Sequence, residues 1–366
     1  MTGAMPARLT LAGWVLLHGE LVRGHVEVEG GRVVAAAEGP SPARPDLEGL
    51  VLPGLADHHT HAGDAAVPPP PAGATPQEVF APPDGYKHRM LASIPRERLV
   101  VGMADYLDRL RAFGTVEHAD FREGGAAGAG MFEVARSRAA HPPVSRVWGR
   151  PPREAFDRRE LDALLPRVHG LGLSAVRDWH WAALRDTVAH ARAAGRPVAL
   201  HCSEVVREEL SRVLELGPDH LVHMVHATDQ DLRDLAAARV PVAVCPRSVG
   251  RFGLRAPVLA MRRAGVAVRL GTDNAMLQTP DVLAEVAHLM REPEVAAQVP
   301  LMEALSWALP VPVSKTSYTH HDIGVRIGAP DLALFPSAGD HPTELLSQGR
   351  IGGASLVMVQ GRIWRI

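Results

Sequence analysis

The chain has 366 residues, of which 46% are hydrophobic, and its formal net charge is −2. This length suits a barrel of about 250 residues plus an accessory domain. The charge shows no basic excess that would point to nucleic acid, so we expect no nucleic-acid partner. Two cysteines imply no disulfide framework and favour the reducing cytoplasm. The apolar run Leu9 to Leu17 is shorter than the ~20 residues of a membrane helix, so we expect no membrane partner.

Both ends of the chain are rich in β-forming residues. The N-terminal part alternates between apolar and polar side chains, and Gly30-Gly31 between two such runs predicts a hairpin. The C-terminal runs D-L-A-L-F and S-L-V-M-V-Q-G-R-I-W-R-I have the same pattern. Because chain termini often lie close together, we expect residues 1–52 and 325–366 to form one accessory β domain beside a domain of residues 53–324.

Between the two ends, strand-like and helix-like segments alternate. Amphipathic helical stretches are expected over residues 98–113, 181–195, 204–216 and 229–239. Eight strand candidates end near His61, Asp120, Gly149, Asp178, His201, His223, Pro246 and Asp273. Such alternation predicts an α/β fold with a parallel sheet. Eight units in this length favour a closed (β/α)8 TIM barrel over an open sheet. No G-x-G-x-x-G or P-loop motif supports a nucleotide-binding fold.

The connection from about residue 62 to residue 94 is long and has little regular pattern. It contains Pro68 to Pro71, and four consecutive prolines block both a helix and a central strand. Connections of this length are usually functional lids or disordered segments. Because this one follows the first barrel strand, we expect a lid over the barrel mouth. A partner-binding polyproline segment is the alternative.

Five side chains with metal-binding or acid–base chemistry follow strand candidates. Side chains alternate along a strand, so His59 and His61 point the same way. His201, His223 and Asp273 follow three further strands, at the end of the barrel where active sites are built. Taken singly, each is better explained as structural. Together they predict a metal site.

This set of side chains suits a catalytic zinc site. Zinc binds imidazole nitrogens and carboxylate oxygens, keeps one position for water, and lowers the pKa of that water. The expected ligands are three histidines and one aspartate: His59, His61, His201 and Asp273. Glu204 is placed to shuttle a proton between the water and the substrate. His223 is placed to polarise the attacked group or to orient the hydroxide, and Asp273 to accept the proton of the water.

Five motifs occur in an order and spacing that resembles the amidohydrolase superfamily, specifically the branch of cytosine deaminase, guanine deaminase and chlorohydrolase-like enzymes. They are P-G-L-A-D-H-H-T-H, H-C-S-E, L-V-H-M-V-H, C-P-R-S and L-G-T-D-N. The resemblance covers nearly the whole chain. It implies a (β/α)8 barrel with a β-sandwich built from both termini, and zinc, or iron in some cytosine deaminases. It implies the following site residues: metal ligands His59, His61 and His201, proton shuttle Glu204, sixth-strand His223 and eighth-strand Asp273.

Lysine occurs only at Lys87 and Lys315. Binuclear members of the superfamily use a bridging carboxylated lysine after strand four or, occasionally, strand three, and neither lysine falls there. We therefore expect one divalent metal ion, zinc or iron. The motif C-P-R-S is followed by Val249, where relatives commonly have asparagine. This departure leaves the substrate contact on that strand open.

Six side chains are candidates for substrate binding. Lys87 and Arg89, with His88 between them, form a basic cluster in the expected lid that suits an anionic substrate group. A solvated loop is the alternative. The other four candidates follow strands two and four: Asp120, Arg122, Arg177 and Trp179. Trp179 is placed either to stack on a flat ring or to pack in the core.

These features predict hydrolytic deamination of an amino-substituted nitrogen heterocycle by a metal-bound hydroxide. The alternative is hydrolysis of an amide or cyclic ureide at the same metal site. The missing bridging lysine favours deamination, because binuclear relatives use two metals for amide hydrolysis. A binding protein built on an inactive barrel is disfavoured, because the ligand set and Glu204 are intact. We expect a polar or anionic heterocycle as substrate. The oligomeric state stays open, and a homo-oligomer is allowed.

Overall fold

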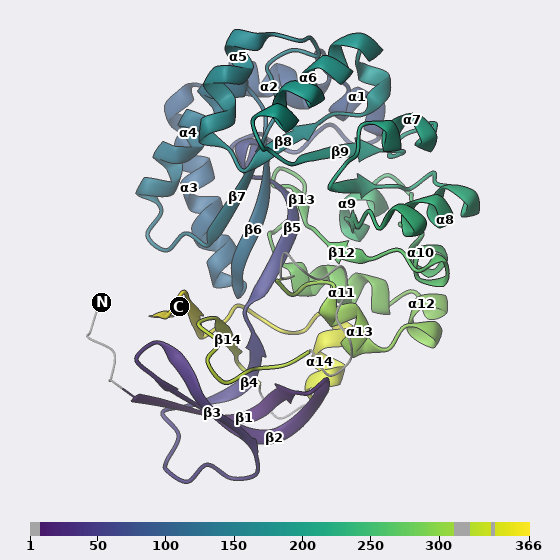
Figure 1. Cartoon of the computed structure of the whole chain (residues 1–366). Coiled ribbons are helices and arrows are strands. Elements are labelled where there is room, and N and C mark those ends of the chain that lie inside the picture. The colour runs from purple at the N-terminus through teal and green to yellow at the C-terminus, as the bar shows by residue number, and fades with distance from the viewer. Residues whose placement is uncertain (1–7, 311–322, 338–340) are drawn as a thin grey trace. The chain divides into compact units, whose positions relative to one another are not determined.

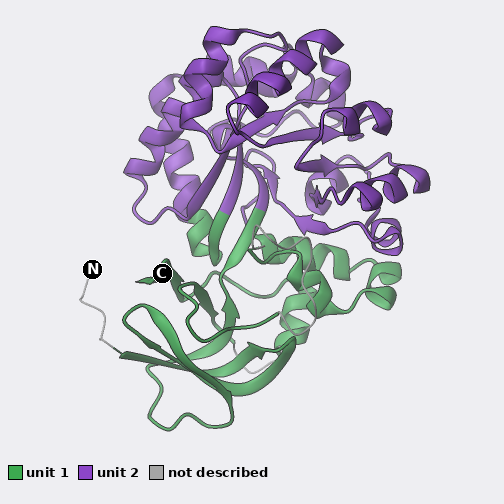
Figure 2. Cartoon of the chain, viewed as in Figure 1, with its two compact units in different colours: residues 1–57, 109–117, 281–366 green, residues 58–108, 118–280 purple. Residues whose placement is uncertain are grey.

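The structure is a computed structural model that describes residues 8–310, 323–337 and 341–366 (Figure 1). The chain divides into two compact units (Figure 2). Unit 1 contains Met1–Asp57, Arg109–Glu117 and Asp281–Ile366, and unit 2 contains His58–Asp108 and His118–Pro280. None of the described helices is long and apolar enough to cross a membrane.

Strands from both ends of the chain form one seven-stranded sheet in unit 1. Its order is β16-β15-β14-β4-β1-β2-β3. The strands are β1 (Arg8–Leu17), β2 (Glu20–Glu29), β3 (Arg32–Glu38), β4 (Leu47–Pro53), β14 (Leu332–Phe335), β15 (Leu356–Val359) and β16 (Arg362–Arg365). Strand β4 is parallel to β1 and antiparallel to β14, so strands from the two chain ends lie in one sheet. The second layer of a sandwich stays a prediction.

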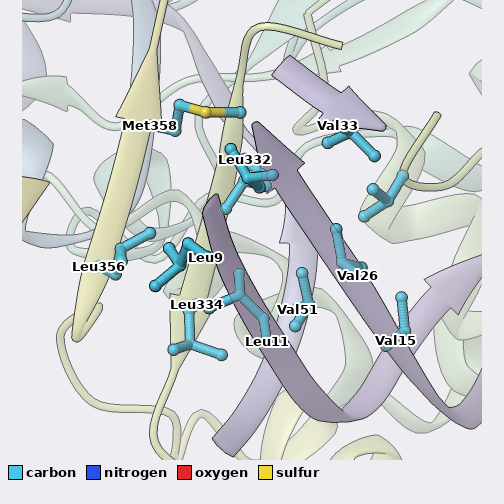
Figure 3. Close-up of a cluster of buried hydrophobic side chains, with 12 residues drawn as sticks. Leu9, Leu11, Val15, Val26, Val33, Val51, Leu332, Leu334, Leu356 and Met358 are labelled. Carbon is cyan, nitrogen blue, oxygen red and sulfur yellow. The ribbon is translucent and has the colours of Figure 1, made fainter. Parts of the chain in front are cut away.

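The hairpin between β2 and β3 follows from two glycines. Gly30 and Gly31 have φ values of 55° and 74°, and a two-residue hairpin turn of this kind needs positive φ at both central positions. Glu29 pairs with Arg32 across the turn, so the predicted hairpin is confirmed. Apolar side chains from strands of both chain ends form the core of this sheet (Figure 3). They include Leu9, Leu11, Val15, Val26, Val51, Leu332, Leu334, Leu356 and Met358.

A second, curled sheet of nine strands has the order β12-β11-β10-β9-β8-β7-β6-β5-β13. Its strands are β5 (Leu55–His61), β6 (Thr115–Arg122), β7 (Val144–Gly149), β8 (Gly170–Leu173), β9 (Val198–Cys202), β10 (His220–His223), β11 (Val242–Val244), β12 (Val268–Leu270) and β13 (Asp273–Asn274). Neighbouring strands from β7 to β12 pair in parallel, and so do β13 and β5. The predicted α/β fold with a parallel sheet is confirmed.

The last strand segments depend on a glycine. Only Gly271 and Thr272 separate β12, which pairs with β11, from β13, which pairs with β5. A Cβ atom on Gly271 would lie 2.6 Å from the Cβ of His59, so a larger residue would push this segment away from β5. The glycine of the L-G-T-D-N motif therefore lets the chain carry Asp273 to the first strand.

Helices follow most strands of the second sheet, as the amphipathic pattern predicts. Three expected helices lie close to their predicted bounds: α3 (Arg96–Ala112), α6 (Trp181–Ala193) and α8 (Asp229–Ala238). Other helices after strands are α4 (Gly125–Arg138), α5 (Arg158–Leu164), α9 (Pro246–Gly250), α10 (Val258–Ala264) and α11 (Val282–Met290). A capping box of Thr228 and Asp231 satisfies the free N–H groups at the start of α8.

Two boundaries predicted from the sequence are wrong. The fourth strand ends at Leu173 and not near Asp178, which lies in the 3-10 helix η3 (Val176–Asp178). The helix expected over residues 204–216 is shorter, because α7 spans only Leu210–Glu215. Ser203 and Glu208 exchange two hydrogen bonds of 3.0 Å, which hold the intervening loop out of the helix. Glu204 therefore lies in a loop after β9.

The expected lid has more regular structure than its sequence predicts. It contains η1 (Ala62–Asp64), α1 (Pro76–Phe80) and α2 (Tyr86–Ser93). A capping box of Thr75 and Glu78 starts α1. The lid packs through an apolar cluster of Val67, Val79, Met276 and Leu277, with Phe80, Tyr86, Met90 and Leu91 against it. Local capping and this cluster form the helices that the proline-rich sequence did not indicate.

Candidate active site

The polar strand ends of unit 2 meet at one place. His59 and His61 lie on β5, His201 on β9, His223 on β10 and Asp273 on β13. Ligand atoms of His59, His61 and His201 lie within 4.8 Å of one another, and so do those of His59, His223 and Asp273. The two groups share His59. The structure therefore brings all five predicted side chains into one buried cluster.

Hydrogen bonds orient two of the imidazoles. His61 Nδ1 lies 3.0 Å from the Phe121 carbonyl oxygen, and His201 Nδ1 lies 2.8 Å from the Leu173 carbonyl oxygen. A carbonyl only accepts, so each Nδ1 carries the proton and each Nε2 keeps its lone pair. Such backbone partners fix the ring and the tautomer of metal-binding histidines.

Burial keeps His59, His61 and His201 neutral. It lowers the pKa of His59 to about 4, while Asp273 opposes the shift. Burial, with the Lys87 charge second, lowers the pKa of His61 to about 3. Burial also takes the pKa of His201 well below its ordinary value. Neutral imidazole is the form that binds a metal, so the cluster is in its ligand state at neutral pH.

Asp273 is ionised and held by three neighbours. Its Oδ1 lies 3.3 Å from His59 Nε2 and accepts a 2.8 Å hydrogen bond from Asn274 Nδ2, and its Oδ2 accepts a 2.5 Å bond from Ser248 Oγ. Burial would raise the pKa of Asp273. The hydrogen bond with His59 and the neighbouring His223 outweigh burial and hold the pKa well below its usual value.

Glu204 and His223 face the same cavity. The Glu204 Oε2 atom lies 3.6 Å from His223 Nε2, and both residues line a pocket with His61, His201 and Asp273. Burial raises the pKa of Glu204, against the opposing effect of His223. A carboxyl group with a raised pKa, beside a pocket, is suited to holding and releasing a proton.

The backbone is strained at the same strand ends. Ser203, His223 and Asp273 have positive φ values of 50°, 74° and 63°. Residues other than glycine rarely adopt this conformation, at a cost on the order of 1–3 kcal/mol each, and they cluster at functional sites. This backbone conformation turns the chain sharply at the positions where metal-binding and proton-transfer side chains face the pocket.

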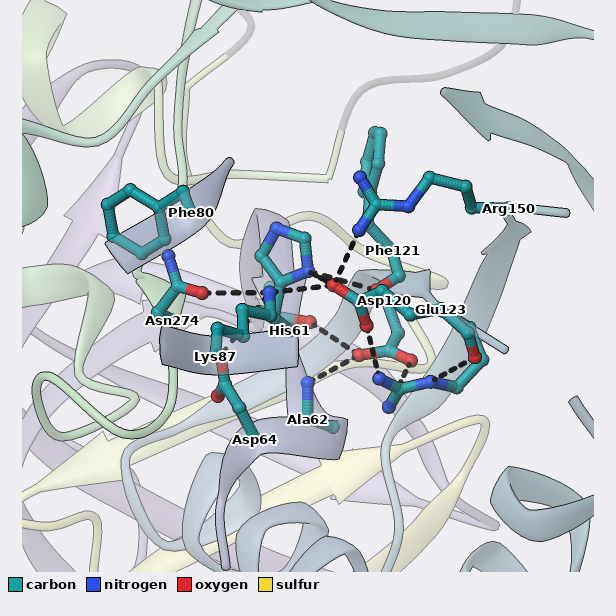
Figure 4. Close-up of polar contacts among 12 residues, drawn as sticks. His61, Ala62, Asp64, Phe80, Lys87, Asp120, Phe121, Glu123, Arg150 and Asn274 are labelled. Atoms are coloured by element: carbon teal, nitrogen blue, oxygen red, sulfur yellow. Dashed lines mark hydrogen bonds and ion pairs between the residues drawn. The ribbon is translucent and has the colours of Figure 1, made fainter. Parts of the chain in front are cut away.

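The two cations expected in the lid lie in different environments. Lys87 is 3% exposed and lines the pocket, where it contacts carboxylates (Figure 4). Arg89 is exposed, donates to the Asp84 carbonyl and lines a separate surface hollow. Both lie on helix α2, where residues two apart point to different faces. The structure therefore does not bring the two cations together.

The other four substrate-binding candidates also differ in position. Arg177 lines the pocket. Trp179 is buried and donates from Nε1 to Ser174 Oγ at 2.9 Å, which favours its packing alternative. Asp120 is buried and accepts a 2.6 Å bond from the Ala62 backbone. Arg122 is buried and bonds to Glu123.

Several polar residues at the site were not among the sequence candidates. Asn274, Ser248 and Asp64 are buried and bond to predicted site residues or to the neighbouring backbone. Arg150 lines the pocket and approaches Glu123 at 3.2 Å. Ser248 and Asn274 belong to the motifs C-P-R-S and L-G-T-D-N, so the motifs were a signal for them. A single Arg150 after a strand carried none.

The donor set fits a divalent transition metal. Three neutral imidazoles and one carboxylate, with strand ends on several sides, are the ligands that catalytic zinc sites use. The chemistry also suits iron, because both metals accept imidazole and carboxylate. Lys315 lies outside the described residues, so the expectation that it does not bridge two metal ions stays a prediction.

No family model matches the chain. A protein named “Putative aminohydrolase” from Archaeoglobus fulgidus is 30% identical over 238 residues, which are 65% of this chain and 67% of that protein. A protein of the same name from Methanothermobacter thermautotrophicus is 28% identical over 350 residues, 88% of this chain and 89% of that protein. The chain belongs to the amidohydrolase superfamily.

The fold of this amidohydrolase agrees with that assignment. The crystal structure of an adenosine deaminase from Xanthomonas campestris with bound zinc superimposes with a TM-score of 0.75 at 16% identity. The match covers 98% of this chain and 93% of that chain. At this identity the likeness shows the fold. The aminohydrolase relatives confirm the resemblance of the five motifs to the superfamily.

Proposed function

We propose that this amidohydrolase deaminates an amino-substituted nitrogen heterocycle by hydrolysis at one divalent metal ion. The observation that carries the proposal is Glu204, a pocket carboxyl group with a raised pKa, beside the three-histidine and aspartate cluster. The names of the aminohydrolase relatives and of the deaminase with the same fold support it. We further propose that the curled sheet is a closed (β/α)8 barrel and that the protein acts in the cytoplasm.

Four residues would hold the metal: His59, His61 and His201, which form one group, and Asp273, whose Oδ1 lies 3.3 Å from His59 Nε2 and 3.5 Å from His61 Nε2. When bound, a zinc ion lowers the pKa of water and makes a nucleophile available near neutral pH. His61 and His201 offer Nε2 because their Nδ1 atoms donate to backbone carbonyls. Asp273 offers a carboxylate that stays ionised in a buried site.

Glu204 moves the protons of the reaction. We propose that its carboxylate accepts a proton from water as the water oxygen attacks the ring carbon bearing the amino group. The same carboxyl then protonates the ring nitrogen, and the carbon becomes tetrahedral. The second proton of the water then passes from the new hydroxyl group to the amino group, the C–N bond breaks, ammonia leaves, and the hydroxyl oxygen becomes a ring carbonyl. General acid–base steps of this kind are worth roughly 10²–10⁴-fold in rate.

His223 and Asp273 complete the arrangement. His223 Nε2 lies 3.6 Å from Glu204, so it is positioned to orient the water and the developing oxyanion. Asp273 is locked by Ser248 and Asn274 and accepts a proton or a hydrogen bond from the same water. Arg177 lines the pocket and is positioned to bind a polar or anionic substituent of the substrate.

Hydrolysis of an amide or cyclic ureide is the second candidate. The donor set also suits this chemistry, whereas the bridging lysine of binuclear relatives is missing after strand four, where the chain reads G-L-G-L-S-A-V-R-D-W. The test is a panel of aminated purines, pyrimidines, pterins and triazines with ammonia detection and mass analysis of the product. One ammonia per intact ring that gains a carbonyl supports deamination. A ring-opened acid or cleaved acyl group without ammonia contradicts it.

Metal analysis tests the number of ions. We expect about one zinc or iron per chain at full activity, because the two candidate ligand groups among the described residues share His59 and so form one site. Two ions per chain at full activity would contradict the mononuclear proposal. A chelator should abolish turnover, and adding back the metal should restore it.

A further inference from the structure

The Lys87 ammonium binds three oxygens, two from residues at strand ends and one from η1. Its Nζ lies 2.6 Å from Glu123 Oε1, 2.9 Å from Asn274 Oδ1 and 3.4 Å from Asp64 Oδ2 (Figure 4). Glu123 follows β6, Asn274 lies on β13, and Asp64 follows β5. Lys87 itself lies on the lid helix α2. One buried side chain thus connects α2 to the ends of β6 and β13 and to η1.

The oxygen that binds Lys87 most closely also contacts a proposed metal ligand. Glu123 Oε1 lies 2.8 Å from His61 Nδ1 and 3.2 Å from Arg150 Nη2, while Oε2 bonds to Arg122. The Nδ1–H of His61 is therefore shared between the Phe121 carbonyl and the Glu123 carboxylate. A carboxylate in this position fixes the imidazole and makes its other nitrogen a stronger ligand.

We propose that Lys87 and Glu123 are positioning residues that couple docking of the lid to metal binding at His61. Lys87 helps to place the Glu123 carboxylate against His61, so docking of α2 supports a second partner, beside the Phe121 carbonyl, that holds the ring in its metal-binding orientation. Binding free energies are reciprocal, so the metal must stabilise the docked lid by the same factor by which docking raises metal affinity. The proposal rests on the metal site of the proposed function.

Burial explains why this link is specific. Lys87 is 3% exposed, and a buried ammonium is stable only beside its carboxylate partners. Arg89, two residues along the same helix, is exposed and bonds to the backbone of Asp84. Arg89→Met therefore removes a cation from α2 without touching the strand ends. It is a matched control for Lys87→Met.

The experiment measures zinc affinity of the full-length, metal-free protein by competition with a chromogenic chelator. We expect Lys87→Met and Glu123→Gln each to weaken zinc binding by about 10–100-fold, the usual effect of losing a partner of a metal-binding histidine. Because Lys87 acts through Glu123, the double variant should bind zinc about as well as the weaker single variant. Arg89→Met should bind like the wild type.

Hydrogen exchange of the wild type tests the coupling between zinc and the lid without relying on the folding of a variant. Zinc should slow amide exchange in α2, and in folded Lys87→Met, checked by circular dichroism, it should no longer do so. Wild-type affinity in both variants, or α2 exchange that zinc does not change in the wild type, would overturn the proposal. A wild type that binds no metal would overturn the proposed function instead, so the two failures are distinguishable.

Discussion

The core of the seven-stranded sheet and the strand ends of unit 2 are both buried but have opposite chemistry. The core around Leu11, Val26 and Met358 is apolar. The strand ends bury histidines, carboxylates and a lysine within a few ångströms of one another. Burying apolar surface stabilises a fold, whereas burying charge costs free energy unless each charge is paired.

This difference separates residues that hold the fold from residues that the chemistry requires. The fold can bury this polar cluster because its side chains pair with one another, as Lys87 pairs with Glu123 and Asp64. The strained backbone at His223 and Asp273 adds to its cost. We therefore expect substitutions at the strand ends to change activity, and substitutions in the apolar core to change stability.

The largest effect is expected for Glu204→Gln. Glutamine keeps the size of the side chain but cannot move a proton, so turnover should fall roughly 10²–10⁴-fold, about 2.7–5.4 kcal/mol in activation free energy. Turnover on a confirmed substrate and metal content are the measurements. The metal content should be unchanged, because Glu204 is not one of the proposed ligands. Turnover near the wild-type rate would mean that Glu204 is structural.

Leu11→Ala tests the other region. Leu11 is fully buried in the sheet core, and a large-to-small substitution there should lower the free energy of unfolding by about 2–5 kcal/mol. Zinc affinity of the folded protein should not change. The control is Val34→Ala on β3, because Val34 is 41% exposed and its loss should cost little. Denaturant unfolding measures both variants, and equal stability of the two would contradict the distinction.

The same difference explains what was predictable from the sequence. His59, His61, His201, His223 and Asp273 each follow an apolar strand, and parallel strands bring such positions to one edge. Their meeting was therefore predictable from local patterns.

The sequence indicates a substrate clamp at Lys87, because no local pattern shows that the lid folds so that Glu123 and Asp64 contact its ammonium. The lid helices were missed for a similar reason. Their packing partners Met276 and Leu277 lie about 200 residues further along the chain, and a local pattern carries no such information.

His118 is expected to make stability depend on pH. It is buried, bonds to Ser145 Oγ at 2.8 Å, and burial lowers its pKa to about 3. Its unfolded pKa is about 6.5, so below that pH the unfolded state binds one more proton. Its contribution to stability is therefore complete above pH 6.5 and falls by about 1.4 kcal/mol per pH unit as the pH drops toward 3.

His118→Asn isolates that contribution. Asparagine does not titrate, so the free energy of unfolding of the variant should fall less steeply between pH 6.5 and pH 5 than that of the wild type. Urea unfolding of both proteins at several pH values measures the difference in slope. Parallel slopes would mean that His118 titrates normally in the folded protein.

The smallest effect is expected for Arg89→Met, and it sharpens the comparison within a single helix. Arg89 is exposed and its bond is to a backbone carbonyl of its own loop, so its removal should change stability by less than about 0.5 kcal/mol. Its charge lies outside the pocket that Lys87 lines, so KM and kcat for a confirmed substrate should both be unchanged. A KM raised several-fold at constant kcat is the mark of lost ground-state binding. That outcome would mean that Arg89 contacts the substrate, which would require the lid to close further over the pocket.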